Sequence, residues 1–173
     1  LKINAVIIRG LNDNEIEALG RFARDENLVM RFIEFMPLDS GRAWQKDHVV
    51  PGREILERLQ SAFNLKSVKM ENASATARRW SFADGSGEVG LISPVSEPFC
   101  GQCNRIRLTS DGKIRTCLFS LREHDLKQLL RSEASDAEII EWLKSVVLQK
   151  EERHHIGEID FEQPDRTMSA IGG

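Results

Sequence analysis

The chain has 173 residues, which is enough for one well-formed core or for one domain with part of another. Apolar residues make up 40% and charged residues 29% of the chain, the composition of an ordinary globular protein. The net charge of −3 argues against a general nucleic-acid-binding protein, which would be basic. Every apolar run is shorter than the roughly 18 residues of a membrane span, and the first residues lack the pattern of a secretion signal. We therefore predict a cytoplasmic protein whose partners are neither nucleic acids nor membranes.

The first 35 residues have the pattern of a strand, a helix and a second strand. Residues 3–8 (INAVII) are nearly all apolar, which indicates a strand covered on both faces. Asn12 or Asp13 can cap a helix that runs to about residue 26. The apolar face of this helix is formed by Ile16, Leu19, Phe22 and Ala23. Residues 29–35 (VMRFIEF) predict a second strand, so the segment is one βαβ unit of a parallel sheet, and we expect further strands upstream of it.

The middle and end of the chain predict a second group of elements. A helix is expected over residues 51–63, with Pro51 at its start. Short strands are expected near residues 65–70, 77–82 and 87–92, and we interpret them as an antiparallel sheet in a second domain. Two helices follow, over about residues 125–131 and 136–150; Ser135 and Glu138 have the spacing of a capping box at the start of the second one.

All three cysteines lie in one segment, FCGQCNRIRLTSDGKIRTCLF, over residues 99–119. Within it, NRIRLT and KIRTC predict two strands of a hairpin. A three-residue turn that ends at Gly112 in a left-handed conformation pairs Arg107 with Arg115 and leaves Ile106 and Leu108 on an apolar face. The opposite face then collects cysteines and arginines, and such a concentration of positive charge predicts an anionic ligand. The residues on this face are Cys103, Arg105, Arg107, Arg115 and Cys117.

Spacing alone leaves three interpretations of the cysteines. They could bind zinc with His124 as the fourth ligand. Cys100 and Cys103 could form a redox disulfide, although Cys117 would be left over. Three thiolates could also hold a 4Fe–4S cluster in which one iron keeps an open position for a substrate atom. His154 and His155 resemble metal ligands too, but their charged surroundings favour a solvated surface.

Four segments together resemble a known family. The segments KINAVIIRGLND, RFIEFMPLD, PFCGQCNRIRLTSDGKIRTCLF and the terminal MSAIGG are similar to the molybdenum cofactor biosynthesis protein A family, the GTP 3′,8-cyclases of the radical-SAM superfamily. The resemblance runs along the whole chain in order. It implies that the cysteine segment holds a 4Fe–4S cluster whose open iron binds the guanine base of GTP.

The resemblance also implies roles for individual residues. The cluster ligands would be Cys100, Cys103 and Cys117. The substrate-binding residues would be Arg105 and Arg107, with Lys2 and Arg31 at the triphosphate of GTP, and Met36 would lie at the S-adenosylmethionine pocket. Arg115 could contact either the substrate or a local carboxylate.

One part of the family pattern is missing from the sequence. The family carries a second 4Fe–4S cluster on a C-x3-C-x2-C motif, which cleaves S-adenosylmethionine to a radical, and this chain has no cysteine left for it. The resemblance therefore implies the C-terminal part of the enzyme, inactive alone. The expected fold is α/β and α+β: the last βαβ of an incomplete parallel (β/α) barrel over residues 1–38, followed over residues 39–160 by a C-terminal domain of antiparallel sheet and helices.

The tail, residues 161–173, ends in Gly172 and Gly173. In the family it is thought to reach the active site; a glycine pair also ends ubiquitin-like carriers, and a disordered end is the simplest interpretation. The resemblance further implies GTP as substrate and a homodimer. Two alternatives stay open: a zinc-binding interaction module with three cysteines and one histidine, and a radical-SAM maturase that uses its auxiliary cluster to hold a peptide.

Overall fold

We describe the fold from a computed structural model, over residues 1–39, 41–70 and 72–171. Gly172 and Gly173, the expected functional end of the tail, lie outside these described residues. The chain forms two compact units. Unit 1 comprises Leu1–Met36 and Trp44–Gln102, and unit 2 comprises residues 37–43 and 103–173.

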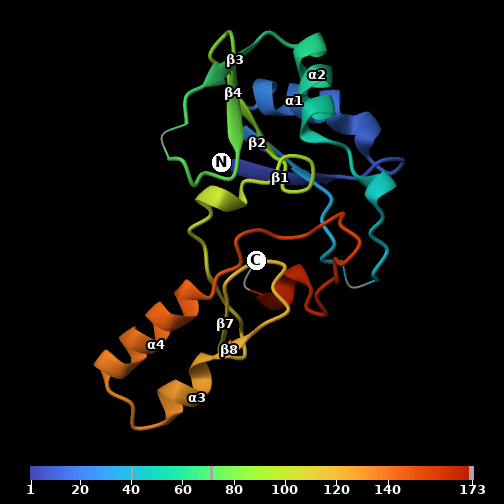
Figure 1. The fold of residues 1–173 in the computed structure, drawn as a ribbon. Coiled ribbons are helices and arrows are strands. Elements are labelled where there is room, and N and C mark those ends of the chain that lie inside the picture. The colour runs from blue at the N-terminus through green and yellow to red at the C-terminus, as the bar shows by residue number, and fades with distance from the viewer. Residues whose placement is uncertain (40, 71, 172–173) are drawn as a thin grey trace. The chain divides into compact units, whose positions relative to one another are not determined.

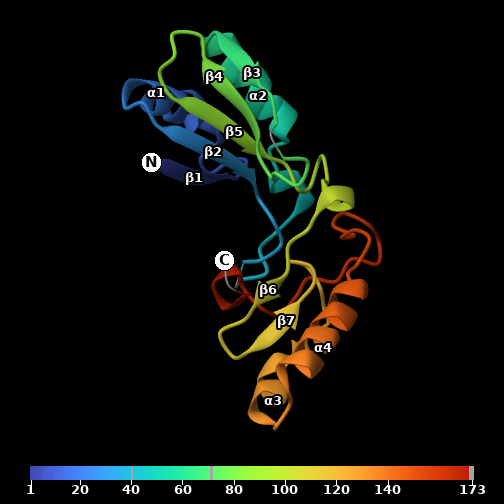
Figure 2. The same ribbon diagram turned by 90° about the vertical axis from the view of Figure 1, so that its left-hand side faces the viewer.

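Unit 1 is built on one five-stranded sheet, with strand order β1-β2-β5-β4-β3 (Figures 1 and 2). Two helices, α1 and α2, lie against one face of it. The elements are β1 (Lys2–Ile7), α1 (Ile16–Asp25), β2 (Val29–Glu34), α2 (Gly52–Ala62), β3 (Leu65–Val68), β4 (Arg78–Phe82) and β5 (Glu88–Ile92). The predicted βαβ unit is confirmed, because β1 and β2 pair in parallel. The overall α/β character that the sequence predicts is confirmed as well.

The prediction of a separate antiparallel sheet after residue 63 is wrong. β3, β4 and β5 do pair antiparallel with one another, but β5 also pairs in parallel with β2, so all five strands share one mixed sheet. The physical reason is burial: Val89, Gly90 and Leu91 of β5 are all buried, and an apolar strand of this kind needs a neighbour on each edge. Its second neighbour lies far back in the sequence, which local patterns do not reveal.

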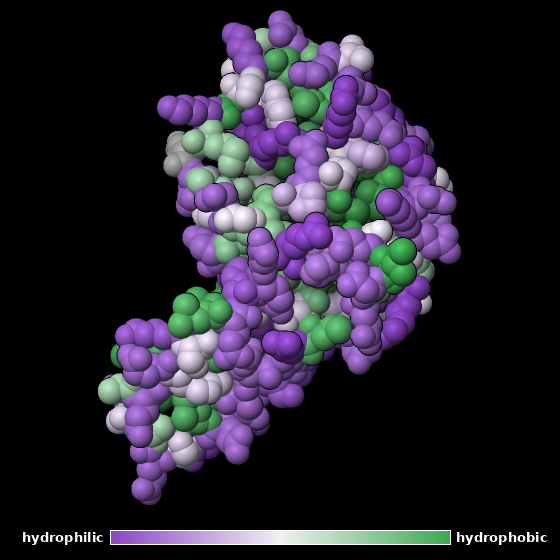
Figure 3. Space-filling model, in the orientation of Figure 1, coloured by the Kyte–Doolittle hydropathy of each residue, from purple (hydrophilic) through white to green (hydrophobic). Residues whose placement is uncertain are grey.

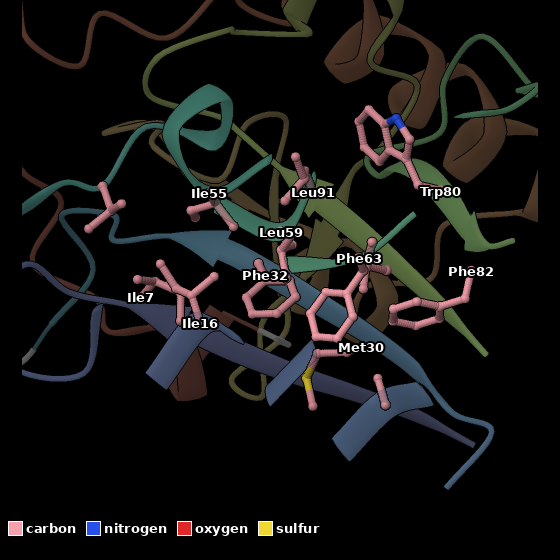
Figure 4. Packing of buried hydrophobic residues seen from close by; sticks show 13 residues of the cluster. Ile7, Ile16, Met30, Phe32, Ile55, Leu59, Phe63, Trp80, Phe82 and Leu91 are labelled. Carbon is pink, nitrogen blue, oxygen red and sulfur yellow. The ribbon is translucent and has the colours of Figure 1, made fainter. Parts of the chain in front are cut away.

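The hydrophobic core of unit 1 lies between the sheet and the two helices (Figure 4). Met30 and Phe32 of β2 belong to this core on the sheet side, and Ile16 and Leu59 meet them from the helices. The opposite face of β1 is open: Lys2, Asn4 and Val6 are exposed. The expectation that the first strand is covered on both faces is therefore wrong for the described residues.

The first helix also begins differently from its prediction. A 3-10 turn (Asp13–Glu15) precedes α1, and the Asn12 side chain does not cap either element. Instead, Asn12 Oδ1 accepts from the Ile8 N–H at 2.8 Å and its Nδ2 donates to the Val6 carbonyl at 2.9 Å, which fixes the end of β1. Phe22, expected in the core, is 46% exposed, because the buried side of α1 is centred on Ile16, Gly20 and Ala23 and Phe22 projects away from it.

Unit 2 contains a three-stranded antiparallel sheet and two helices. Its elements are β6 (Arg107–Leu108), β7 (Lys113–Arg115), β8 (His124–Asp125), α3 (Leu126–Arg131) and α4 (Asp136–Leu148), with a 3-10 turn at Met168–Ile171. The capping box of Ser135 and Glu138 at the start of α4 is confirmed. The described residues contain no helix that is both long and apolar enough to cross a membrane.

The hairpin of β6 and β7 has the predicted register. Arg107 pairs with Arg115, the Thr109 N–H donates to the Lys113 carbonyl at 2.9 Å, and Gly112 has φ of 88°. The expected apolar face is only half correct: Ile114 is 4% exposed, but Leu108 opposite it is 55% exposed. Strand β6 is short and lies at the edge of its sheet, so its apolar side chain stays at the surface.

Candidate functional site

The open face of the unit 1 sheet carries a row of residues in register across four strands. Asn4 pairs with Arg31, Arg31 with Gly90, and Gly90 with Arg79. Because alternate side chains of a strand share a face, Lys2 lies on the same face as Asn4 and is a diagonal neighbour of Arg31. Gly90 leaves space beside Arg31: a Cβ added there would lie 3.4 Å from Arg31 Cγ. The structure thus brings together Lys2 and Arg31, which the resemblance places at the triphosphate.

The cations on this open face differ in whether they have partners. Arg79 is neutralised by Glu88, with its Nε 2.8 Å from the carboxylate. Lys2 and Arg31 make no ion pair and no side-chain hydrogen bond with any residue that the structure describes. Two unpaired cations on one face of a sheet can bind an anion without first breaking an existing bond.

The end of β2 is fixed by the buried carboxylate of Glu34. This group accepts from the backbone N–H of Gly52 at 2.7 Å and from those of Val95 and Ser96 at 2.8 and 2.9 Å. Glu34 thereby joins β2 to the start of α2 and to the segment after β5. Met36 follows directly, half-buried, just beyond the carboxyl end of the strand.

The three cysteines divide between the two units. Cys100 begins a 3-10 turn (Cys100–Gln102) at the end of unit 1, and Cys103 and Cys117 belong to unit 2. All three are half-buried free thiols. Covalent geometry limits the distance between the Cα atoms of Cys100 and Cys103 to about 11 Å.

Within unit 2, four of the five residues predicted to share one face of the hairpin interact with one another: Cys103, Arg105, Arg107 and Cys117. Arg105 Nη2 lies 3.2 Å from Cys103 Sγ. Burial raises the pKa of the Cys103 thiol, but hydrogen bonds from the backbone and guanidinium of Arg105 outweigh it, so the pKa lies below its usual value. Burial, followed by the charge of Arg105, lowers the pKa of Arg107, and the charges of Cys103 and Cys117 oppose that change. Cysteine side chains beside guanidinium groups fit an anionic iron–sulfur cluster, which binds cysteines as thiolates.

Arg115 belongs to the structure of the hairpin and not to its exposed surface. Its side chain is 2% exposed, donates to the Ser120 carbonyl and lies 3.5 Å from a carboxylate oxygen of Glu123. The structure shows the contact with a local carboxylate, one of the two roles that the sequence left open for Arg115.

Two further ionic groups were not predicted. Lys150, just past α4, donates from Nζ to the carbonyls of Arg105 and Thr116. Arg166, in the tail, contacts Asp111 at 2.7 Å and Glu123 at 2.5 Å. Each joins residues far apart in the sequence, and neither has a local pattern that could have indicated it.

The zinc interpretation finds no support in the placement of His124. This residue lies in β8 and pairs with Ile114, so it shares the face of Ile114 and not that of Arg115 and Cys117. The group of potential metal ligands that unit 2 does hold in its described part is different: His155, Glu158 and Asp160, with ligand atoms within 4.8 Å of one another. All three are exposed, as the charged sequence predicted for His155. The same prediction is wrong for His154, which is half-buried with its ring centre 5.2 Å from that of Phe119.

Comparisons with known proteins agree with the motifs. The family model described as Molybdenum Cofactor Synthesis C matches residues 28–156. The chain is 44% identical over its whole length to a GTP 3′,8-cyclase of Rhodopirellula baltica and covers 49% of that protein. It is 42% identical to the GTP 3′,8-cyclase of Streptomyces coelicolor, covering 51% of it, and 44% identical to that of Mycolicibacterium smegmatis, covering 49%. The chain spans about half the length of these curated relatives. Together with the hairpin of cysteines and arginines, the family match shows that the chain belongs to the Molybdenum Cofactor Synthesis C family.

Proposed function

We propose that this chain is the C-terminal part of a GTP 3′,8-cyclase, which carries out the first step of molybdenum cofactor biosynthesis. The observation that carries the proposal is the group formed by Cys103, Cys117, Arg105 and Arg107 in a member of this family. The whole protein would be a radical-SAM lyase that joins C3′ of the GTP ribose to C8 of guanine. Because all three cysteines of this chain lie in the hairpin segment, radical generation would belong to residues outside it.

The three cysteines would hold a 4Fe–4S cluster, which supplies an iron with an open coordination position for an atom of the substrate. Arg105 and Arg107 would orient GTP and balance the charge of the thiolates. Lys2 and Arg31 would bind the triphosphate, since they are unpaired cations on one face of the sheet. Met36 would contact S-adenosylmethionine beyond the end of β2.

The remaining parts of the proposal concern the organisation of the protein. Residues 1–38 would complete a (β/α) barrel, residues 39–160 would form the cluster and substrate domain, and residues 161–173 would be a tail that brings Gly172 and Gly173 to the substrate. The protein would be cytoplasmic and homodimeric, and this chain alone would be inactive.

The test is anaerobic reconstitution of the chain with iron and sulfide, followed by EPR of the reduced protein with and without GTP. We expect a 4Fe–4S signal that GTP changes and that Cys117→Ala abolishes. His124→Ala serves as the matched control and should leave the signal intact. Tight binding of one zinc ion without iron uptake, lost in His124→Ala, would establish the zinc module instead. A cluster signal that guanine nucleotides never change would favour a maturase that binds a peptide.

A further inference from the structure

The two strands of the cysteine hairpin stop pairing just before they reach the cysteines. The last pair of the β6–β7 ladder toward the cysteines is Arg107 with Arg115. Beyond it, the carbonyls of Arg105 and Thr116 accept from a third group, the ammonium of Lys150, at 3.0 Å for Arg105. Beyond the last ladder pair, Lys150 therefore links the two segments through these two carbonyls.

Thr116 is held a second time from the same place. Its Oγ1 donates to Glu151 Oε2 at 2.6 Å, and the residue is 1% exposed. Lys150 and Glu151 are consecutive and lie just beyond the C-cap residue of α4. The segment after this helix therefore holds the residue before Cys117 by both its backbone and its side chain. A buried peptide held by two charged groups has little freedom to shift.

The Lys150 ammonium also brings a positive charge close to both cysteines in the sequence. The two carbonyls that it contacts belong to Arg105, two residues after Cys103, and to Thr116, directly before Cys117. This positive charge has a second effect besides donating hydrogen bonds. Of the possible charge states of the site, it stabilises the one with more negative charge.

We propose that Lys150 is a positioning residue for the metal site: it holds the segments that carry Cys103 and Cys117 apart at the spacing the cluster needs, and its charge favours the reduced cluster. This inference rests on the proposed function, because it assigns Lys150 to the same cluster. Lys150 would touch neither the iron nor the substrate, and it would act through the backbone of Arg105 and Thr116.

The test uses the complete chain, reconstituted anaerobically, with iron and sulfide content, EPR spectrum and midpoint potential as readouts. Lys150→Met removes the charge and the donors; we expect it to retain less iron and to have a more negative midpoint potential. Lys150→Arg should restore the wild-type potential. Lys144→Met is the matched control, because Lys144 lies within the neighbouring helix α4 with a side chain 63% exposed, and its loss should change nothing. Lys150→Met with the wild-type iron content, spectrum and potential would overturn the proposal.

Two additional measurements keep the inference separate from its premises. If Lys150→Met does not fold, Lys150→Gln keeps a donor without the charge, and a wild-type potential in that variant would overturn the electrostatic role. If the wild-type chain takes up no cluster at all, the proposed function fails. Amide hydrogen exchange of Thr116 and Cys117 in the metal-free chain then tests whether Lys150 positions this segment. Faster exchange in Lys150→Met than in Lys144→Met supports positioning, and equal exchange refutes it.

Discussion

Single cations on the open sheet face differ in their expected contribution to nucleotide binding. Arg31 and Arg79 lie in the same row, on either side of Gly90, but only Arg79 is already paired, with Glu88. A hydrogen bond between a charged side chain and a phosphate contributes about 1.5–3 kcal/mol. The loss of Arg31 should therefore decrease the affinity for GTP by about tenfold or more.

We therefore predict that Arg31→Ala weakens equilibrium binding of GTP about tenfold or more, whereas Arg79→Ala changes it little. The comparison ligand is guanosine, which lacks the phosphates. Its binding should be the same in wild type and Arg31→Ala if the arginine acts on the triphosphate. An equal loss for GTP and guanosine would place Arg31 elsewhere.

A second residue-scale prediction concerns Glu123, which joins three cations. Burial raises the pKa of this carboxyl, but hydrogen bonds from Arg166 and Lys113 outweigh burial and hold the pKa below its ordinary value of 4.5. When the pKa of a carboxyl is lower in the folded than in the unfolded chain, its charge stabilises the fold at any pH above the unfolded-state pKa. That contribution is lost as the pH falls through the folded-state pKa.

We predict that the wild-type chain loses free energy of unfolding between about pH 5 and pH 3, and that Glu123→Gln loses less over the same interval. Urea titrations at several pH values measure this difference. Glu141→Gln is the control, because Glu141 pairs with Lys144 on the surface and its side chain is 71% exposed. Parallel pH profiles for wild type and Glu123→Gln would contradict the prediction.

At the scale of elements, the turn of the cysteine hairpin depends on Gly112. This residue has φ of 88°, and a Cβ added to it would lie 2.7 Å from Cβ of Lys127. Gly85 has a similar φ of 81° in the turn between β4 and β5, but no atom lies within 4 Å of its added Cβ. A comparison of alanine substitutions at the two glycines therefore distinguishes the cost of backbone strain from the cost of steric overlap.

We predict that Gly85→Ala lowers the free energy of unfolding by about 1 kcal/mol, the cost of a left-handed conformation for a residue with a side chain. Gly112→Ala should cost more, because Lys127 must also move, and it should loosen the segment that carries the arginines. Chemical denaturation measures both values. A smaller loss of unfolding free energy in Gly112→Ala than in Gly85→Ala would contradict the prediction, because it would mean that Lys127 moves aside at no cost.

The elements also show how far the sequence could predict this structure. The capping box at Ser135 and the register set by Gly112 are local, so a few residues specify each of them. The pairing of β5 with β2 is not local, and the sequence pattern of β5 is compatible with several neighbours. The site divides in the same way: the grouping of Cys103, Arg105, Arg107 and Cys117 follows from the hairpin register, whereas Lys150 contacts Arg105 from a position 45 residues away in the sequence.

At the scale of the whole molecule, the two units differ in how they are stabilised. All members of the main hydrophobic core, from Ile7 to Leu91, belong to unit 1. In unit 2, several large apolar side chains are exposed, among them Leu130 at 55% and Leu148 at 86%, and hydrophobic residues show at the surface over α3 and α4 (Figure 3). Unit 2 depends more on ionic contacts such as those of Arg166 and Lys150.

A unit with a small core gains more from a bound metal group, because the free energy of binding adds to the free energy of folding. We predict that removing the cluster from the reconstituted chain increases amide hydrogen exchange across β6, β7 and the end of α4 by at least about tenfold, while β2 and β5 in unit 1 stay protected. Hydrogen exchange of the loaded and metal-free chain, analysed by mass spectrometry, measures both units in one sample. The metal-free Cys117→Ala chain is the control and should match the metal-free wild type in unit 1. Equal protection of unit 2 with and without the cluster would mean that its ionic contacts alone are sufficient to hold the fold.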